Sequence, residues 1–211
     1  MGKKAELYLI RHGQTEWNKA HRFQGQLDSP LTPVGVRQAA ALAKRLQSVS
    51  FDAIYSSDLN RAYQTAKIIA VSHGKPIIKD QRLRERCYGI FQGLTRPEIS
   101  DKYSEFYQAY KQDAFKFIIP GAESSEEIVE RTMSCLNELA EKHLGQRILI
   151  VSHGGIIGRF LRMVLGIPLQ TSRHFRVANT GINIFTYRNQ RWRLETLGEV
   201  SFMKDDIKKM K

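Results

Sequence analysis

The sequence predicts an α/β protein in which helices cover both faces of one sheet. Strand-like apolar runs alternate with helical patterns along the 211 residues, which is typical of a sheet between two helical layers. Two of the runs, at 5–10 and 147–151, are short and mostly apolar, as buried strands are. No repeat, low-complexity stretch or linker interrupts the pattern. We therefore expect a single domain over residues 1–211.

The first half of the chain alternates between strands and helices. The expected elements are, in order, a strand at 5–10, a helix that Thr32 caps, a strand at 52–55, a helix that follows Asp58 and carries 62–69, and a strand at 76–78. Thr32 is a good N-cap candidate because Pro33 follows it and apolar residues then recur at helical spacing.

The second half begins with a weaker pattern. Residues 89–122 hold six aromatic side chains from Tyr103 to Phe117, and we expect a cap-like insertion of one or two helices there. These aromatics form either a ring-binding substrate pocket or the core of small cap helices. The remaining expected elements are a helix at 124–143 with Ser125 as its cap, a strand at 147–151, a helix at 156–165, a hairpin of 181–187 and 192–197, and a frayed tail at 204–211.

The composition is basic. There are 33 Lys and Arg against 21 Asp and Glu, a formal net charge of +12. Such an excess fits nucleic acid, an anionic membrane surface or a small anionic substrate as partner, and it also fits a plain basic surface. Two cysteines exclude a disulfide-rich scaffold and a four-cysteine zinc site. No apolar run approaches the ~20 residues that cross a bilayer, and no secretory signal opens the chain, so we expect a cytoplasmic protein without a membrane partner.

Two strands end in the same way. The run at 5–10 leads into Arg11-His12-Gly13, and the run at 147–151 leads into Ser152-His153-Gly154. In open α/β sheets, ligands bind outside the carboxyl ends of strands, and a glycine lets the backbone approach a ligand closely. One such histidine fits a loop residue that only hydrogen-bonds its neighbours. Two of them favour a functional site.

The charge around these histidines favours an anion over a metal. The other four histidines show no metal-ligand spacing, and Arg11 would repel a cation. Arginine also suits bidentate contacts to phosphate. We therefore expect no metal and no cofactor. Local pattern alone does not distinguish Arg61 from an exposed helix arginine, or Glu85 from a member of a surface ion-pair cluster.

A series of motifs runs in order along almost the whole chain: Arg11-His12-Gly13-Gln14-Thr15 with Asn18, Phe23-Gln24-Gly25, Asp28-Ser29-Pro30-Leu31-Thr32, Gly35 with Gln38-Ala39, Ser56-Ser57-Asp58-Leu59 with Arg61-Ala62, Leu83-Arg84-Glu85-Arg86 with Tyr88-Gly89, Pro120-Gly121 with Glu123-Ser124, and Val151-Ser152-His153-Gly154-Gly155. This series resembles the histidine phosphatase superfamily, and most closely its branch of cofactor-dependent phosphoglycerate mutases and related phosphatases. The resemblance implies a three-layer sandwich with a mixed, mostly parallel sheet of the phosphoglycerate mutase type.

The resemblance also implies catalytic roles. His12 matches the nucleophile that becomes a phosphohistidine, and His153 matches the second histidine at the phosphoryl group. Arg11 and Arg61 match the phosphate clamp. Glu85 matches the proton donor to the leaving alkoxide, which then acts as the base for water.

Five further residues match substrate contacts. Asn18 and Gln24 match contacts to phosphoryl oxygens, and Gly154 is expected to add a backbone N–H. Gly25 and Tyr88 belong to matching motifs and are expected to bind substrate.

The implied chemistry makes two demands on protonation. His12 needs one ring nitrogen free, so its other nitrogen must donate to a neighbour, for which we expect a backbone carbonyl. The arginines keep His12 neutral, but they also favour the ionised form of Glu85, which must carry a proton to act as an acid. We therefore expect higher phosphatase activity at mildly acidic pH.

The fold does not separate phosphatase from mutase. The mutase pattern has an adjacent arginine pair in a longer insertion, whereas residues 93–120 are short and hold single basic residues at Arg96, Lys102, Lys111 and Lys116. We therefore favour a metal-independent phosphomonoesterase acting on a small phosphorylated metabolite. A phosphoglycerate mutase that uses 2,3-bisphosphoglycerate is the alternative, because the segment around Glu85 is also mutase-like. A non-catalytic module that binds a phospho-ligand is the remoter one.

Macromolecular partners have little support in the sequence. The segment nearest to a nucleic-acid stripe is the arginine-rich turn at 188–193, which is typical of plain surface. We therefore expect no nucleic acid as partner. A homodimer through edge-to-edge pairing of the terminal hairpin remains open.

Overall fold

The protein is built around one six-stranded mixed sheet. The computed structural model describes residues 2–171 and 174–203, so the predicted tail at 204–211 lies outside the described residues. The strand order is β3-β2-β4-β1-β5-β6. The strands are β1 (Ala5–Arg11), β2 (Ala53–Ser56), β3 (Ile77–Lys79), β4 (Arg147–Ser152), β5 (Ile182–Arg188) and β6 (Arg191–Glu199). The first four strands pair in parallel, and the β5–β6 hairpin adds to β1 in antiparallel fashion. The mixed, mostly parallel sheet is thus confirmed.

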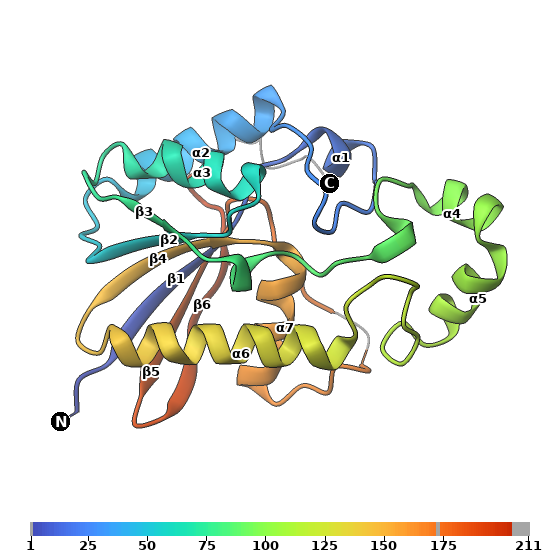
Figure 1. The fold of residues 1–211 in the computed structure, drawn as a ribbon. Helices are drawn as coiled ribbons and strands as arrows, with labels where there is room; N and C mark the ends of the chain where they lie inside the picture. Colours follow the sequence, from blue (N-terminus) through green and yellow to red (C-terminus); the bar gives the residue numbers. More distant parts are fainter. Residues whose placement is uncertain (1, 172–173, 204–211) are drawn as a thin grey trace.

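Helices cover both faces of the sheet (Figure 1), with α2 (Pro33–Leu46) and α3 (Asn60–Ala70) on one side and α6 (Ser125–Lys142) and α7 (Gly154–Leu165) on the other. Strand β4 contributes side chains to the apolar clusters on both faces of the sheet, because successive side chains of a strand point to opposite faces. Ile148 and Ile150 belong to the apolar cluster that includes residues of α6 and α7, while Leu149 and Val151 join the cluster with α2 and α3. Burial on both faces explains the mostly apolar run.

Helix ends follow local hydrogen bonding. Thr32 caps α2 as predicted, since its side chain accepts a hydrogen bond from the Gly35 N–H. The prediction of Ser125 as a cap is wrong. Ser124 caps α6 in a capping box with Glu127, and the Ser125 hydroxyl donates to the Phe115 carbonyl. Helix α7 begins at Gly154, two residues before the predicted start.

The segment predicted as a cap-like insertion stands to one side of the sheet (Figure 1) and holds the short helices α4 (Arg96–Lys102) and α5 (Ser104–Gln112). A single turn of 3-10 helix, η1 (Gln81–Leu83), precedes the segment, and a second, η2 (Gly89–Phe91), begins it. Its apolar centre is a separate cluster around Phe91, Ile99 and Ile119. Whether the segment covers a bound substrate remains a prediction.

The aromatic side chains of this segment are mainly internal. Tyr103, Tyr107, Tyr110 and Phe117 pack against the cluster around Phe91, and Phe106 is 41% exposed. The contacts favour the core of small helices over a ring-binding pocket.

The fold bears on two further expectations, the membrane span and the dimer through the terminal hairpin. Among the described residues, no helix combines the length and apolar character that a membrane span requires. Strand β6 forms one edge of the sheet, so the edge that a hairpin-mediated dimer would use is present. The dimer itself remains a prediction.

Candidate active site

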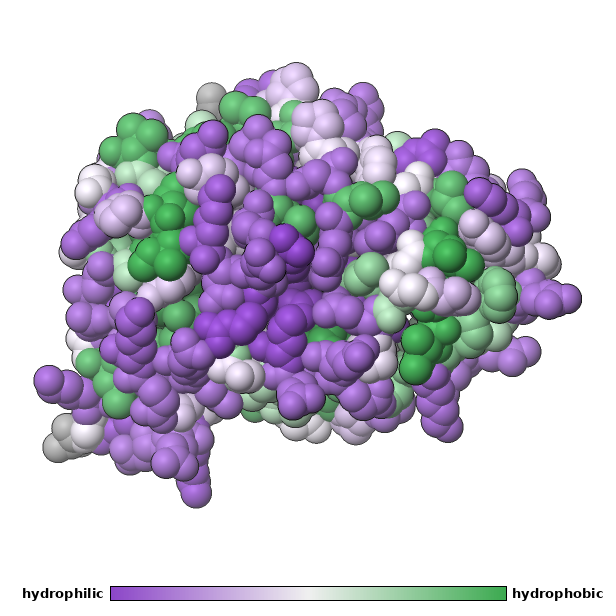
Figure 2. Space-filling view, viewed as in Figure 1, coloured by the Kyte–Doolittle hydropathy of each residue, from purple (hydrophilic) through white to green (hydrophobic). Residues whose placement is uncertain are grey.

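The two histidine turns meet at one edge of the sheet. Strands β1 and β4 are adjacent and parallel, with Arg11 opposite Ser152, so His12 and His153 follow side by side. The His12 amide donates to the Ser152 carbonyl at 3.0 Å, and the two imidazole centroids lie 5.2 Å apart. Figure 2 shows strongly hydrophilic side chains gathered in the middle of this face of the molecule, between the sheet and α4–α5.

A cleft of about 770 Å³ opens at this edge. Nine of the ten predicted site residues line it: Arg11, His12, Asn18, Gln24, Gly25, Arg61, Glu85, Tyr88 and Gly154. The tenth, His153, is fully buried beside His12. The lining also includes Trp17, His21, Arg22, Phe23, Arg96, Arg176 and Asn179. Glu85 is the one carboxylate among the described lining residues, so the cleft is strongly cationic.

The His12 ring is held in one tautomer. Its Nδ1 lies 2.8 Å from the Gly13 carbonyl oxygen. A carbonyl only accepts, so Nδ1 carries the proton and Nε2 keeps its lone pair. Burial lowers the pKa of His12 well below its usual value, and the charges of Arg61 and Arg11 lower it further. The lowered pKa favours the neutral ring with a free Nε2 lone pair, and the role of His12 as nucleophile remains a prediction.

His153 is held from the other side. Its Nε2 lies 2.8 Å from the Ser57 hydroxyl, while its buried Nδ1 has no hydrogen-bond partner among the described residues. Burial lowers the pKa of His153 well below its usual value, followed by the charges of Arg61, His12 and Arg11. For Nδ1 to donate toward a phosphoryl oxygen, Nε2 must accept from the Ser57 hydroxyl. Ser57 is thus suited to fix the tautomer of His153.

We expect Ser57→Ala to lower kcat/KM about tenfold, the order of one lost hydrogen bond. The reason is that the variant no longer selects the Nδ1–H tautomer of His153. Nitrogen NMR of the labelled imidazole checks the tautomer alongside the kinetics, and Ser57→Thr, which retains the hydroxyl, should recover most of the activity. A variant with unchanged tautomer and unchanged kinetics would contradict this role.

The two buried histidines also link stability to pH. Their pKa values are lowered in the folded state, so below about pH 6.5 the unfolded chain binds protons that the folded protein does not. We expect the free energy of unfolding to fall as pH drops below 6.5, by up to about 1.4 kcal/mol per pH unit for each histidine. Urea titrations between pH 7 and 5 measure the slope. His12→Gln should reduce it by about half, whereas the exposed His174→Gln should leave it unchanged.

Arg61 is buried, with 1% of its surface exposed, so the alternative of an exposed helix arginine is wrong. Its side chain extends from α3 to the loop that precedes α2. Its Nη1 donates to Asp28 Oδ1 at 2.9 Å and to the Leu27 carbonyl at 2.8 Å, and its Nη2 donates to the Gly25 carbonyl at 2.6 Å. Burial lowers the pKa of Arg61, which the Asp28 carboxylate opposes. The guanidinium is therefore fixed before any ligand binds.

Glu85 is held by backbone donors. Its Oε1 accepts from the Arg86 N–H and its Oε2 accepts from the Gly155 N–H, both at 2.8 Å. The alternative of a surface ion-pair cluster is wrong among the described residues, because the neighbouring arginines bind other groups: Arg82 binds Asp80 and Glu138, Arg84 binds Asp58, and Arg86 binds the Glu123 carbonyl. A Cβ atom on Gly155 would lie 2.1 Å from Oε1, so any larger residue there would have to displace this carboxylate.

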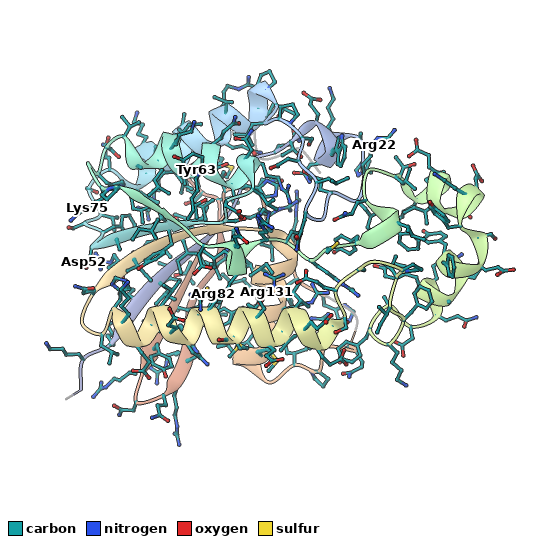
Figure 3. The ribbon with its side chains drawn as sticks, in the orientation of Figure 1. Arg22, Asp52, Tyr63, Lys75, Arg82 and Arg131 are labelled. Carbon is teal, nitrogen blue, oxygen red and sulfur yellow. The ribbon has the colours of Figure 1, made fainter. Side chains whose placement is uncertain are left out.

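Helix α6 fixes the segment that carries Glu85. Figure 3 shows Arg131 and Arg82 on neighbouring parts of the α6 side of the molecule. The Arg131 guanidinium donates to the carbonyls of Arg82 and Arg84 at 2.6 and 2.9 Å and also pairs with Glu123. The bonds to Arg82 and Arg84 hold the segment just before residue 85, and Glu123 holds it just after, since its Oε2 accepts from the Cys87 N–H at 2.7 Å.

The other expected contacts lie around the same cleft. Gln24 Oε1 accepts from the Thr15 hydroxyl at 3.0 Å. Asn18 Oδ1 accepts from the Thr15 N–H at 3.3 Å. Burial, together with the charge of Glu85, raises the pKa of Tyr88 to about 12, so Tyr88 stays protonated.

Several residues that organise the site were not predicted. Asp28 orients Arg61, Ser57 bonds His153, and Asn179 donates to the His12 carbonyl at 2.8 Å. Thr65 accepts from the Gly13 N–H. Asp28 and Ser57 do lie within the quoted motifs, but Asn179 is 167 residues from its partner and has no local signal. Among the described residues, no group of three or more His, Cys, Asp or Glu is placed to hold a metal ion.

The arrangement suits the binding and transfer of phosphoryl groups, because a neutral histidine, two guanidiniums and a carboxyl group line one cleft. A family model for the histidine phosphatase superfamily (branch 1) matches residues 7–200. The chain belongs to this superfamily.

Individual relatives cover almost the whole chain. A metal-independent phosphoserine phosphatase of Arabidopsis thaliana is 38% identical over 202 residues, which is 94% of this chain and 83% of that protein. A Proteus mirabilis protein named "Probable phosphoglycerate mutase GpmB" is 38% identical over 95% of both chains. The crystal structure of the alpha-ribazole phosphatase from Shigella flexneri superposes with a TM-score of 0.85 at 29% identity, covering 92% of this chain and 96% of that one. The phosphoglycerate mutase-like fold is confirmed.

Proposed function

We propose that this protein is a metal-independent phosphomonoesterase that hydrolyses small phosphate esters through a phosphohistidine at His12. The observation that carries the proposal is the His12 ring. Its Nδ1 is bonded to a carbonyl, its pKa is lowered by burial and by two arginines, and its Nε2 is left available within the cleft.

The first half of the reaction transfers the phosphoryl group to the protein. Arg11 and Arg61 neutralise the phosphoryl oxygens, and the His12 Nε2 lone pair forms a bond to phosphorus while the bond to the ester oxygen breaks. Glu85, as the carboxylic acid, gives its proton to the leaving alkoxide. The resulting carboxylate is stabilised by the N–H groups of Arg86 and Gly155.

The second half returns the protein to its starting state. The Glu85 carboxylate takes a proton from a water molecule, whose oxygen forms a bond to phosphorus as the bond to His12 breaks. Inorganic phosphate leaves, His12 regains its lone pair and Glu85 is again a carboxylic acid. Charge on the phosphoryl oxygens is shared with the arginines throughout, and His153 contacts them from beside His12.

The cap segment favours hydrolysis over mutase activity. A mutase needs a second strongly cationic site that keeps a bisphosphorylated intermediate bound. Lys102 and Lys111 lie over the rings of Tyr103 and Tyr107, and Lys116 pairs with Asp113. Of the basic residues in this segment, Arg96 is the one among the described residues lining the cleft.

Mixing with a phosphate ester, followed by rapid quenching and mass spectrometry, tests the proposal. We expect an acid-labile phosphoryl group on the peptide that contains His12. Incubation with 3-phosphoglycerate and catalytic 2,3-bisphosphoglycerate tests the mutase alternative: release of inorganic phosphate supports a phosphatase, and rapid isomerisation would show a mutase. Turnover without a phosphorylated His12 would refute the mechanism.

A further inference from the structure

A second, smaller recess lies behind Glu85. It has a volume of about 260 Å³ and shares Arg11, Glu85, Tyr88 and Gly154 with the main cleft. Its remaining lining comes from α7: Gly155, Gly158, Arg159 and Arg162. The Glu85 carboxylate therefore lies between two cavities, one lined by His12 and one lined by α7.

The guanidinium of Arg159 makes fewer contacts to the described residues than that of Arg162, the other arginine that α7 contributes to this recess. Arg162 is anchored, because it donates to the carbonyls of Leu169 and Thr171, both at 2.6 Å. Arg159 makes one hydrogen bond to the described residues, a long one of 3.3 Å to the Gly155 carbonyl of its own helix. No carboxylate of the described residues forms an ion pair with it.

A second cation, the buried Arg86, lies near Arg159 without lining the recess itself. Arg86 is 2% exposed and its guanidinium lies 5.7 Å from the centre of the Tyr88 ring. Its Nη2 is buried without a hydrogen-bond partner among the described residues. Burial lowers the pKa of Arg86, and the nearby charge of Arg159 lowers it further. Two cations thus lie close together without an ion pair, an arrangement that an anionic ligand would stabilise.

We propose that this recess binds a carboxylate in the alcohol part of the substrate, with Arg159 as the charged donor. The preferred substrates are then phosphate esters of small hydroxy acids. This inference rests on the proposed function, because it takes the phosphoryl group to be at His12 and the leaving oxygen to be at Glu85. From Glu85 the alcohol part extends into the recess, whose volume lies below the ~300–1,000 Å³ of pockets for larger ligands.

A matched pair of substrates tests the assignment. O-phosphoserine and O-phosphoethanolamine differ only by the carboxylate, so their ratio of kcat/KM isolates that group. We expect the wild type to prefer O-phosphoserine, and Arg159→Gln to lower kcat/KM for it by about 10- to 100-fold, mainly through KM, as for one lost charged hydrogen bond. Turnover of O-phosphoethanolamine and of p-nitrophenyl phosphate should change about twofold or less. Arg159→Lys should recover part of the preference.

Arg96→Gln is the matched control, because Arg96 is an exposed arginine on the rim of the main cleft. The inference is overturned if the wild type does not prefer O-phosphoserine, or if Arg159→Gln lowers kcat/KM equally for O-phosphoserine and O-phosphoethanolamine. It is also overturned if Arg96→Gln alone removes the preference. In each of these cases the wild type still hydrolyses p-nitrophenyl phosphate. Loss of all phosphate release from the wild type would instead refute the proposed function, and the inference with it.

Discussion

Replacing His12 with alanine is expected to lower kcat for p-nitrophenyl phosphate by about 10⁴-fold or more, since removing a nucleophile leaves only binding and electrostatic effects. The variant loses the Nε2 lone pair but keeps Arg11, Arg61 and Glu85. It should therefore still bind inorganic phosphate or a substrate, which calorimetry measures. Continuous detection of released phosphate with purified protein gives the rate.

The control for this variant is His174→Gln, which removes an exposed histidine and should keep the wild-type rate. A His12→Ala protein with full activity would show that His12 is not the nucleophile. A variant that neither binds phosphate nor folds would instead point to a structural role, and urea titration at pH 7 distinguishes that result. The structure predicts the opposite, because alanine removes a desolvated polar ring without creating a buried charge.

The position of the two histidines could be predicted because it depends on simple features of the chain. The runs that became β1 and β4 are mostly apolar since both faces of the sheet are covered. Parallel strands bring their carboxyl ends to one edge, which places His12 beside His153. The bond from His12 Nδ1 to a carbonyl also follows, because a nucleophilic imidazole needs its other nitrogen protonated.

The partners of these residues could not be derived in the same way. Arg61 sits near the start of a helix, where most arginines are solvated, and its burial depends on the carbonyls of Gly25 and Leu27, over thirty residues away. Asn179 and Arg159 have no periodic or compositional signal. Their positions at the site follow from where loops and α7 cross the sheet edge, and local propensity does not determine such crossings.

The errors in the predicted ends of helices α6 and α7 have a different cause. Ser124 and Ser125 are equally good caps by composition, and the choice between them follows from the packing of Ser125 against the Phe115 carbonyl. Helix α7 starts at Gly154, directly after His153, and one of its first N–H groups, that of Gly155, donates to Glu85. The predicted start at 156 left the glycine pair outside the helix, whereas in the structure the pair lets the helix approach Glu85 and Arg11 closely.

Replacing Glu85 with glutamine is expected to produce a loss that depends on the leaving group. For an alkyl ester such as O-phosphoserine, kcat/KM should fall by about 10²- to 10⁴-fold, the usual contribution of a general acid. For p-nitrophenyl phosphate the fall should be about tenfold or less, because a nitrophenolate leaves without protonation. The ratio kcat/KM is the right measure, since it reports the steps up to transfer to His12 and excludes the later hydrolysis in which Glu85 acts as a base.

Gly155→Ala provides an independent test of the same role. The variant keeps the carboxylate, but its new Cβ would lie 2.1 Å from Glu85 Oε1 and must displace it. If Glu85 acts by protonating the leaving oxygen, this displacement should reproduce the leaving-group dependence of Glu85→Gln. If both variants instead lowered kcat/KM equally for alkyl and aryl esters, Glu85 would act only through binding or charge. The proton would then have to come from another group, of which the protonated Tyr88, at the same junction of cleft and recess, is the nearest in chemistry.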